Sequence, residues 1–214
     1  LSIDEAAGVP IEFGTADDCL FEFGHFQAGE RVLVQAGAGG VGLAAIQLAK
    51  AAGASTVIAT ASSDERLARL HELGMDHGIN YAREDVPARV RELTDGHGVD
   101  LVIDPVGGST LEASIAALAY RGRISWLGRA GRETRPPDVW PLMEKNASLT
   151  GVFLGAEMAR NPARVRAMIE RLLQRAAAGE LRVVIDRVFP LAEAAAAHAY
   201  IEERRAFGRV LLRP

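Results

Sequence analysis

The chain has 214 residues, of which 49% are hydrophobic and 24% charged, and its formal net charge is -4 at pH 7. This composition is typical of a globular protein, and the length suffices for one domain with a substantial core, or for one domain and a piece of another. The negative net charge gives no indication of a nucleic-acid partner, and no apolar run reaches the roughly 18 residues of a membrane span. The single cysteine excludes a disulfide framework and a thiolate zinc cluster. We therefore expect a cytoplasmic protein that binds neither a membrane nor a metal ion.

The N-terminal stretch predicts two short helices. Residues 2–5 (Ser-Ile-Asp-Glu) are a capping box, which opens a helix that runs through Ala7. Residues 10–23 form a second helical stretch, and we expect an interruption near Gly14. Cys19 lies within this stretch and is expected to behave as a small buried hydrophobic residue.

The stretch from residue 30 to residue 63 predicts a strand, a glycine turn, a helix and a second strand. Residues 31–36 are an apolar run typical of a buried strand, and the glycine motif 37–42 follows directly. Residues 43–52 have helical periodicity, and residues 57–60 form the next strand. A G-x-G-x-x-G motif in this context indicates a dinucleotide-binding βαβ unit.

The three glycines of the motif have separate roles in such a unit. We expect Gly37 to make the tight turn, Gly39 to let the backbone approach a diphosphate, and Gly42 to let the helix pack closely on its strand. The helix N-terminus would then offer free N–H groups to the phosphates. The alternative is a tight turn that binds no ligand.

The end of the second strand indicates which nucleotide the site prefers. An NAD site needs an acidic residue about 20 residues beyond the motif, but residues 60–63 (Thr-Ala-Ser-Ser) contain none. Small hydroxyls with a nearby cation favour the 2′-phosphate of NADP(H), and the missing acid also argues against S-adenosylmethionine. Ser62 with Glu65 can alternatively be read as a capping box. The candidates for the 2′-phosphate site are Ser62, Ser63, Arg66 and Tyr81.

The alternation of strands and helices continues along the chain. The expected helices are 63–73, 86–93 and 111–119, and the expected strands are 77–81, 99–104 and 122–128. Such alternation predicts an α/β, Rossmann-type, doubly wound parallel sheet, in which all carboxyl ends of the strands meet at one edge. The turns that converge there are 37–42, 61–63, 81, 106–108 and 128. Ligands of such sheets bind in the crevice beyond that edge.

The C-terminal third is expected to contain a proline-rich loop followed by further strands and helices. The loop is 129–141; the strands are 148–154, 183–189 and 209–212; the helices are 161–178 and 191–204. Arg209 follows Gly208 and is a candidate for approaching the cofactor phosphates, although the arginines of this region can equally be a solvated face.

These motifs, in this order, resemble the zinc-independent medium-chain dehydrogenase/reductase family, in its quinone oxidoreductase (ζ-crystallin-like) branch. The resemblance covers essentially the whole chain. The residues that carry it are Ala36 to Gly42, Gln47 to Lys50, Gly53 and Ala54, Ile79 to Tyr81, Leu93 to Gly96, Val99 to Gly108, and Gly208.

The resemblance implies an NADPH-dependent enzyme that reduces a small molecule, namely a quinone, an enone or an enoyl thioester, and that forms a homodimer. It implies that Gly39, Gly40 and Val41 hold the diphosphate. It also places Arg66 and Tyr81 at the 2′-phosphate. The resemblance places Thr15, Gly128 and Phe153 around the nicotinamide. Val106, in the turn after strand 99–104, is a further candidate for cofactor binding.

The family's N-terminal substrate domain, a GroES-like β-barrel, has no counterpart in this sequence. We expect residues 1–180 to form the dinucleotide-binding domain and residues 181–214 to be a segment of the otherwise absent catalytic domain. Because most substrate contacts come from that barrel, this chain alone is expected to bind NADPH while possessing little or no activity. The alternatives are a non-catalytic NADPH-binding module and the enoyl-reductase portion of a larger synthase.

No residue is assigned a catalytic role. A packing or turn role is favoured for Asp100 and Asp104, which lie on one strand. None of the five histidines has metal-ligand spacing, and each is expected at the surface or on a helix; they are His25, His71, His77, His97 and His198.

Overall fold

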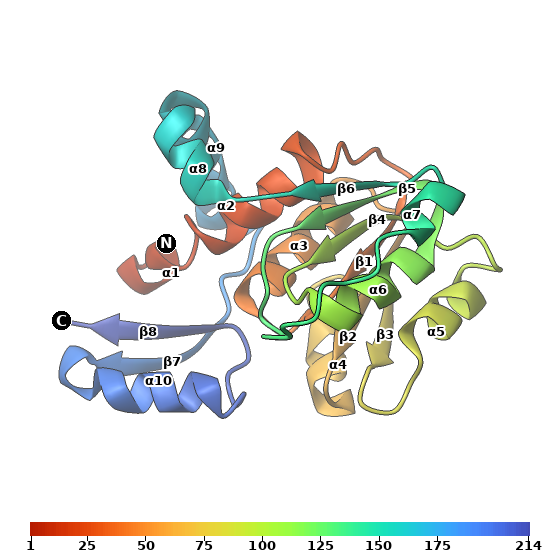
Figure 1. The fold of residues 1–214 in the computed structure, drawn as a ribbon. Coiled ribbons are helices and arrows are strands. Elements are labelled where there is room, and N and C mark those ends of the chain that lie inside the picture. Colours follow the sequence, from red (N-terminus) through yellow and green to blue (C-terminus); the bar gives the residue numbers. More distant parts are fainter.

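The computed structural model describes residues 1–214 and has a six-stranded parallel sheet at its centre (Figure 1). The strand order is β3-β2-β1-β4-β5-β6, and every neighbouring pair is parallel. This is the strand order of a doubly wound dinucleotide-binding sheet, so the predicted fold class is confirmed. The strands are β1 (Arg31–Val34), β2 (Thr56–Ala61), β3 (His77–Asn80), β4 (Val99–Asp104), β5 (Leu118–Trp126) and β6 (Ser148–Gly151).

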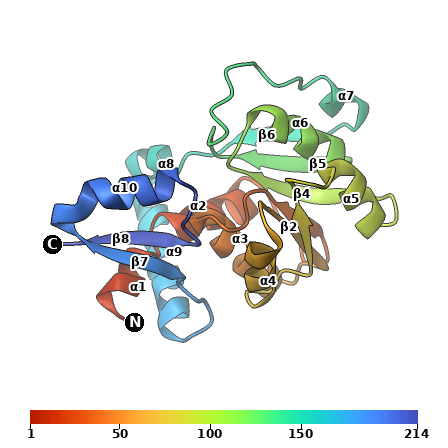
Figure 2. The same cartoon turned by 90° about the horizontal axis from the view of Figure 1, so that it is seen from below.

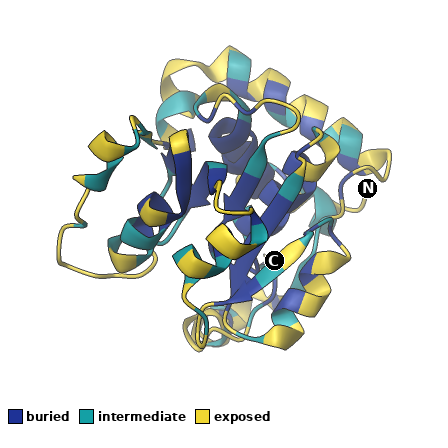
Figure 3. Ribbon diagram, turned by 90° about the vertical axis from the view of Figure 1, so that its right-hand side faces the viewer, coloured by how far each residue is buried: buried dark blue, intermediate teal, exposed yellow.

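Helices cover both faces of this sheet, because alternate strand residues point to opposite sides. Val32 and Val34 of β1 belong to one apolar cluster, whereas Leu33 between them belongs to the other. The first cluster packs against α3 (Gly40–Ala51) and α4 (Asp64–His71), together with α2 (Glu12–Asp17) and α9 (Pro162–Ala177). The second packs against α5 (Val86–Leu93) and α6 (Gly108–Ala117). The buried residues accordingly lie between helices whose outer turns are exposed (Figure 3).

The C-terminal segment forms a second, two-stranded parallel sheet. Strand β7 (Ile185–Pro190) pairs with β8 (Arg209–Arg213), and the connection runs through η2 (Leu191–Glu193) and α10 (Ala194–Glu202). Figure 2 shows this unit at the side of the molecule, next to α1 (Ile3–Ala7) and apart from the central sheet. The division at residue 180 stays a prediction.

The N-terminal helices agree with the sequence in one respect and differ in another. The capping box is present: Ser2 Oγ accepts from Glu5 N at 3.2 Å, and Glu5 Oε2 accepts from Ser2 N at 2.7 Å. The expected interruption at Gly14 is wrong, because α2 continues through Gly14 and changes into a π-helix at Asp18–Glu22. A Cβ on Gly14 would lie 3.2 Å from side-chain carbons of both Leu154 and Met168, so this glycine serves close packing.

The region after β5 also departs from expectation. The predicted strand 148–154 ends at Gly151, and Phe153 is instead the N-cap residue of α8 (Leu154–Arg160). The proline-rich stretch closes with a short helix, α7 (Pro141–Glu144). No helix of the chain combines the length and the apolar character that crossing a membrane requires.

Candidate functional site

The glycine turn lies at the carboxyl end of β1 and leads directly into α3. The N-cap residue of α3 is Gly39, and no side chain caps this helix end. The N–H groups of its first turn therefore remain available to a ligand. A Cβ on Gly39 would meet only the Ala36 carbonyl oxygen, at 3.4 Å, so the space in front of this backbone is open.

The other two glycines of the motif serve packing. A Cβ on Gly42 would lie 2.6 Å from Ala36 O and 2.7 Å from Gly37 Cα, which no real side chain tolerates. This agrees with the expected close approach of helix and strand. A Cβ on Gly37 would lie 2.9 Å from carbons of Ala59 and Leu70. Gly37 therefore also permits a close contact, and the positive φ at the turn belongs to Ala36 (51°) instead.

The end of β2 brings the candidate 2′-phosphate residues together. Ser63 is the N-cap residue of α4, and its Oγ accepts from Arg66 N at 3.3 Å. The predicted capping box of Ser62 and Glu65 is therefore wrong, because the helix begins one residue later than that pairing requires. Ser62 is left exposed beside the cap. Tyr81 N donates to Ala61 O, so the exposed tyrosine lies at the same edge.

Arg66 makes contacts that the sequence does not indicate. Its guanidinium donates to the carbonyl oxygens of Ala206 at 2.8 Å, Arg204 at 2.5 Å and Arg205 at 3.1 Å. These carbonyls follow α10, so the C-terminal segment lies against α4 beside the end of β2. These three hydrogen bonds hold the guanidinium in a fixed orientation, and its remaining N–H groups are available to a phosphate.

A second turn of the crevice follows β4. The side chain of Asp104 is fully buried, and its Oδ1 accepts from Val106 N at 2.8 Å and Gly107 N at 2.9 Å. Gly107 has φ of 72°, and a Cβ there would lie 3.2 Å from Gly128 O. Val106 and Gly128, both predicted to bind the cofactor, are therefore neighbours. Trp126 Nε1 fixes the second of them by donating to Gly128 O at 2.6 Å.

The remaining predicted contacts lie on other elements. Thr15 is nearly buried on α2, and Phe153 is 74% exposed at the start of α8. Neither side chain forms a hydrogen bond to the turns 37–42 and 105–108. Arg209, at the start of β8, pairs with the Glu12 carboxylate of α2. A Cβ on Gly40 would lie 2.5 Å from Glu12 Cγ, so this ion pair lies directly against the glycine turn.

Glu12 is a site residue that the sequence did not reveal. It is 6% exposed, and its Oε2 has no hydrogen-bond partner. Burial raises the pKa of this carboxyl group, and the positive charge of Arg209 opposes that rise. Nothing in a short helical stretch distinguishes a glutamate of this kind from a solvated one. The pairing with Arg209 neutralises a charge that would otherwise repel an anion at α3.

These residues fit an NADP(H) molecule. The uncapped first turn of α3 and the open face of Gly39 suit a diphosphate, and the acid-free end of β2 with Arg66 suits an additional phosphate. The chain contains no group of three or more His, Cys, Asp or Glu side chains placed to hold a metal ion.

Comparison with known proteins gives a matching family model. Residues 40–174 match the model described as "Zinc-binding dehydrogenase". This range begins at the first residue of α3 and ends within α9, so it includes β2 to β6 but not β1 or the turn before α3.

Individual proteins resemble the chain over its full length. It is 37% identical to a quinone oxidoreductase of Pseudomonas aeruginosa, covering 100% of this chain and 66% of that protein. The solved structure of mycobacterial Rv1454c complexed with NADPH is 33% identical, with a TM-score of 0.92, covering 100% of this chain and 66% of that one. The CurK enoyl reductase is 32% identical, with a TM-score of 0.85, covering 100% and 64%. The chain spans about 60% of the length of the curated relatives it matches.

Proposed function

The chain belongs to the quinone oxidoreductase branch of the medium-chain dehydrogenase/reductase family, of which it is the Rossmann-type nucleotide-binding domain, and on this premise we propose that it binds NADPH for hydride transfer to a quinone, an enone or an enoyl substrate. The diphosphate lies on the first turn of α3. The 2′-phosphate lies at the end of β2, and the nicotinamide lies beside the turn after β4. The proposed contacts are Thr15, Gly37, Gly39, Gly40, Val41, Gly42, Ser62, Ser63, Arg66, Tyr81, Val106, Gly128, Phe153 and Arg209.

One observation supports this proposal above the others: a helix N-terminus without a side-chain cap lies one strand away from an oriented guanidinium. The distance between neighbouring parallel strands is about 4.8 Å. An extended dinucleotide can therefore place its diphosphate at α3 while its ribose reaches the next strand, β2. At that strand the phosphate would meet Arg66 instead of the carboxylate that an NAD site requires.

In this proposal the chain's own residues bind and orient the cofactor. The bound nicotinamide cofactor supplies the hydride chemistry. The turn held by Asp104 and the carbonyl of Gly128 form the wall against which the ring is oriented, and the apolar first cluster below the crevice excludes water. In the whole protein, residues 181–214 complete a substrate domain, which agrees with the small size of the sheet formed by β7 and β8.

The test compares the two nucleotides at matched concentrations. NADPH should raise the melting temperature of the chain by several degrees, and NADH should raise it much less, because only NADPH carries the phosphate that Arg66 recognises. Arg66→Gln should reduce the NADPH shift to that of NADH. Equal shifts from both nucleotides in the wild type would contradict the NADPH assignment.

A second candidate function is the enoyl-reductase portion of a larger synthase. The 32% identity to part of a polyketide synthase subunit of Mycobacterium tuberculosis favours it, together with the similarity to the CurK enoyl reductase. A panel of quinones and enoyl thioesters with NADPH distinguishes the candidates, measured on this chain and on a version extended at its N-terminus. Turnover of enoyl thioesters alone supports the synthase, turnover of quinones supports the oxidoreductase, and binding without turnover in both versions supports a non-catalytic module.

We further propose that the protein forms a homodimer through β6. This strand pairs only with β5, so its other edge is unpaired, and the exposed Phe153 lies two residues beyond its end. Val152 N donates to Trp126 O of β5, so the N–H of Gly151, one residue earlier, points to the unpaired edge. Gly151→Pro removes that donor and should convert a dimer into a monomer in sedimentation velocity runs. A wild type that sediments as a monomer at high concentration would rule out this dimer.

A further inference from the structure

A continuous chain of buried hydrogen bonds runs beneath the crevice, across the carboxyl ends of three strands. Thr60 Oγ1, on β2, donates to Gln35 Oε1 at 2.9 Å. Gln35 Nε2 donates to Ser114 Oγ of α6 at 3.1 Å, and Ser114 Oγ donates to Asp104 Oδ2 at 2.8 Å. These residues come from β2, the end of β1, α6 and the end of β4, and all four are at most 2% exposed.

The donors in this chain all point in one direction. Thr60 donates to Gln35, Gln35 to Ser114, and Ser114 to the Asp104 carboxylate, whose oxygens only accept. A buried carboxylate is costly to leave without partners, and bonds arranged head to tail in a dry environment polarise and strengthen one another. The loss of any one member therefore weakens the remaining hydrogen bonds. Such a network acts as a unit more than as a set of separate pairs.

The two ends of the network hold the two turns of the proposed cofactor site. At one end, Thr60 Oγ1 accepts from Ala36 N at 3.1 Å, and Ala36 opens the glycine turn in a left-handed conformation with φ of 51°. At the other end, Asp104 Oδ1 accepts from Val106 N and Gly107 N, which form the turn beside Gly128. Each turn has its backbone fixed by a terminal member of the same chain.

We propose that Thr60, Gln35, Ser114 and Asp104 are positioning residues that couple the diphosphate turn to the nicotinamide turn, so that a change beneath one end of the cofactor alters binding at the other. This inference rests on the proposed NADPH site. None of the four side chains reaches the surface to contact the cofactor itself. Their effect is exerted through the backbone of Ala36 on one side and of Val106 on the other.

The experiment is a double-mutant cycle of Thr60→Val and Ser114→Ala, read by calorimetric dissociation constants. Two ligands are titrated: NADPH, and adenosine 2′,5′-bisphosphate, which lacks the nicotinamide. Each single variant should weaken NADPH about tenfold. Ser114→Ala should also weaken the bisphosphate at least threefold, although Ser114 lies under the other turn. The double variant should bind NADPH at least threefold better than the product of the two losses predicts.

Two controls separate positioning from general destabilisation. Thr60→Ser keeps the hydroxyl and should retain wild-type affinity. Thr94→Val makes the same chemical change at a buried threonine far from the crevice, whose hydroxyl donates to Val90 O and accepts from Gly98 N. It should lower the melting temperature without altering either dissociation constant. If Thr60→Val does not fold, Gln35→Met takes its place in the cycle, because Gln35 joins Thr60 to Ser114.

The outcomes distinguish this inference from the proposed function. A wild type that binds both ligands, with losses in the double variant that simply multiply, would overturn the coupling alone. A bisphosphate affinity unchanged by Ser114→Ala would do the same. A wild type that binds neither ligand would overturn the proposed function and this inference with it.

Discussion

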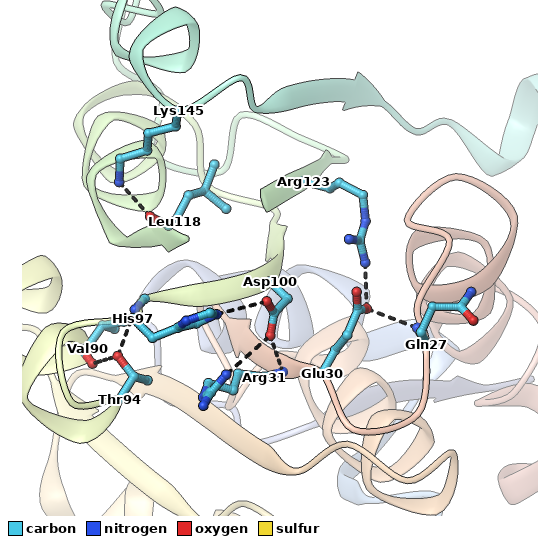
Figure 4. A network of polar contacts seen from close by, with 11 residues as sticks. Gln27, Glu30, Arg31, Val90, Thr94, His97, Asp100, Leu118, Arg123 and Lys145 are labelled. Atoms are coloured by element: carbon cyan, nitrogen blue, oxygen red, sulfur yellow. Dashed lines mark hydrogen bonds and ion pairs between the residues drawn. The ribbon is translucent and has the colours of Figure 1, made fainter. Parts of the chain in front are cut away.

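The two edges of the central sheet differ in the backbone groups that their polar side chains leave free. At the amino edge, charged groups satisfy backbone atoms and one another (Figure 4): Glu30 pairs with Arg123, and Asp100 accepts from Arg31 N while lying near His97. The side chains of Glu30 and Arg123 are 19% and 23% exposed, so water still reaches them. At the carboxyl edge the side-chain network is buried and contains a single carboxylate, and the helix end above it carries no cap.

This difference separates stability from binding. At the amino edge, side chains accept hydrogen bonds from backbone N–H groups: Glu30 accepts from Gln27 N, and Thr94 accepts from Gly98 N. The carboxyl edge leaves the N–H groups of α3 free and fixes their position from below, through Thr60 and Ala36. Mutations at the first edge are therefore expected to change the free energy of unfolding, and mutations at the second to change ligand affinity.

The largest effect is expected at Gly42, where a substitution changes both the stability of the fold and the affinity for the ligand. Gly42→Ala places a Cβ 2.6 Å from Ala36 O and 2.7 Å from Gly37 backbone atoms, so α3 must move away from its strand. We expect a loss of about 3 kcal/mol in the free energy of unfolding, measured by urea denaturation. Gly151→Ala is the matched control, because no atom lies within 4 Å of a Cβ there. Equal midpoints for both variants would contradict the role of Gly42.

Gly39→Ala is expected to affect binding alone. Its Cβ would meet only one atom, Ala36 O at 3.4 Å, so the free energy of unfolding should change by less than about 1 kcal/mol. The same methyl group would occupy the space where we place the diphosphate, and NADPH affinity should fall at least tenfold in a fluorescence titration. Unchanged affinity would remove the diphosphate from this turn.

Arg123→Met tests the amino edge, with the opposite pattern expected. Arg123 donates to Glu30 and, through Nε, to Gly24 O at 2.7 Å. Its loss should lower the free energy of unfolding by about 1–2 kcal/mol and leave NADPH affinity unchanged. Arg182→Met, which removes an ion pair with Glu72 whose two side chains are each 65% exposed, should have almost no effect. A weaker affinity for NADPH in Arg123→Met would show that the two edges are not independent.

The smallest effect concerns pH and Glu12. Burial raises the pKa of Glu12 above its unfolded value of 4.5, so its contribution to stability is fully present below that pH and is lost as pH rises through the folded pKa. Glu12→Gln does not titrate. The difference in unfolding free energy, wild type minus variant, should therefore decrease as pH is raised from 4 to 7. A difference that increases with pH would mean that attraction to Arg209 outweighs burial.

The sequence predicted most of the sheet because its strands are short apolar runs with clear ends. Both bounds of β4 and of α5 were predicted correctly, and β4 carries Asp104 to the edge where it was expected. The missed start of α4 has a local cause: Ser62 and Ser63 are adjacent hydroxyls, and either satisfies a capping pattern. The π-helix after α2 has no sequence pattern of its own.

The site was predicted less completely, because its polar contacts join distant parts of the chain. Glu12 meets Arg209 across nearly the whole sequence, and Gln35 meets Ser114 across 79 residues. No periodicity indicates such pairs. The glycines were predictable because the requirement for them is local, whereas the side chains that orient the turn depend on how four elements meet.

The hydrogen bonds from Arg66 to the residues after α10 have a consequence for where this protein can be divided. The two sheets lie in separate parts of the chain, since the large sheet ends at Gly151 and the small one begins at Ile185. Hydrogen bonds nevertheless join these parts, since Arg66 holds three carbonyls that lie 138 to 140 residues away and Gly208 N donates to Ala38 O at 3.1 Å. A polypeptide cut after α9 would keep every strand of the large sheet and lose the three carbonyls that orient the Arg66 guanidinium.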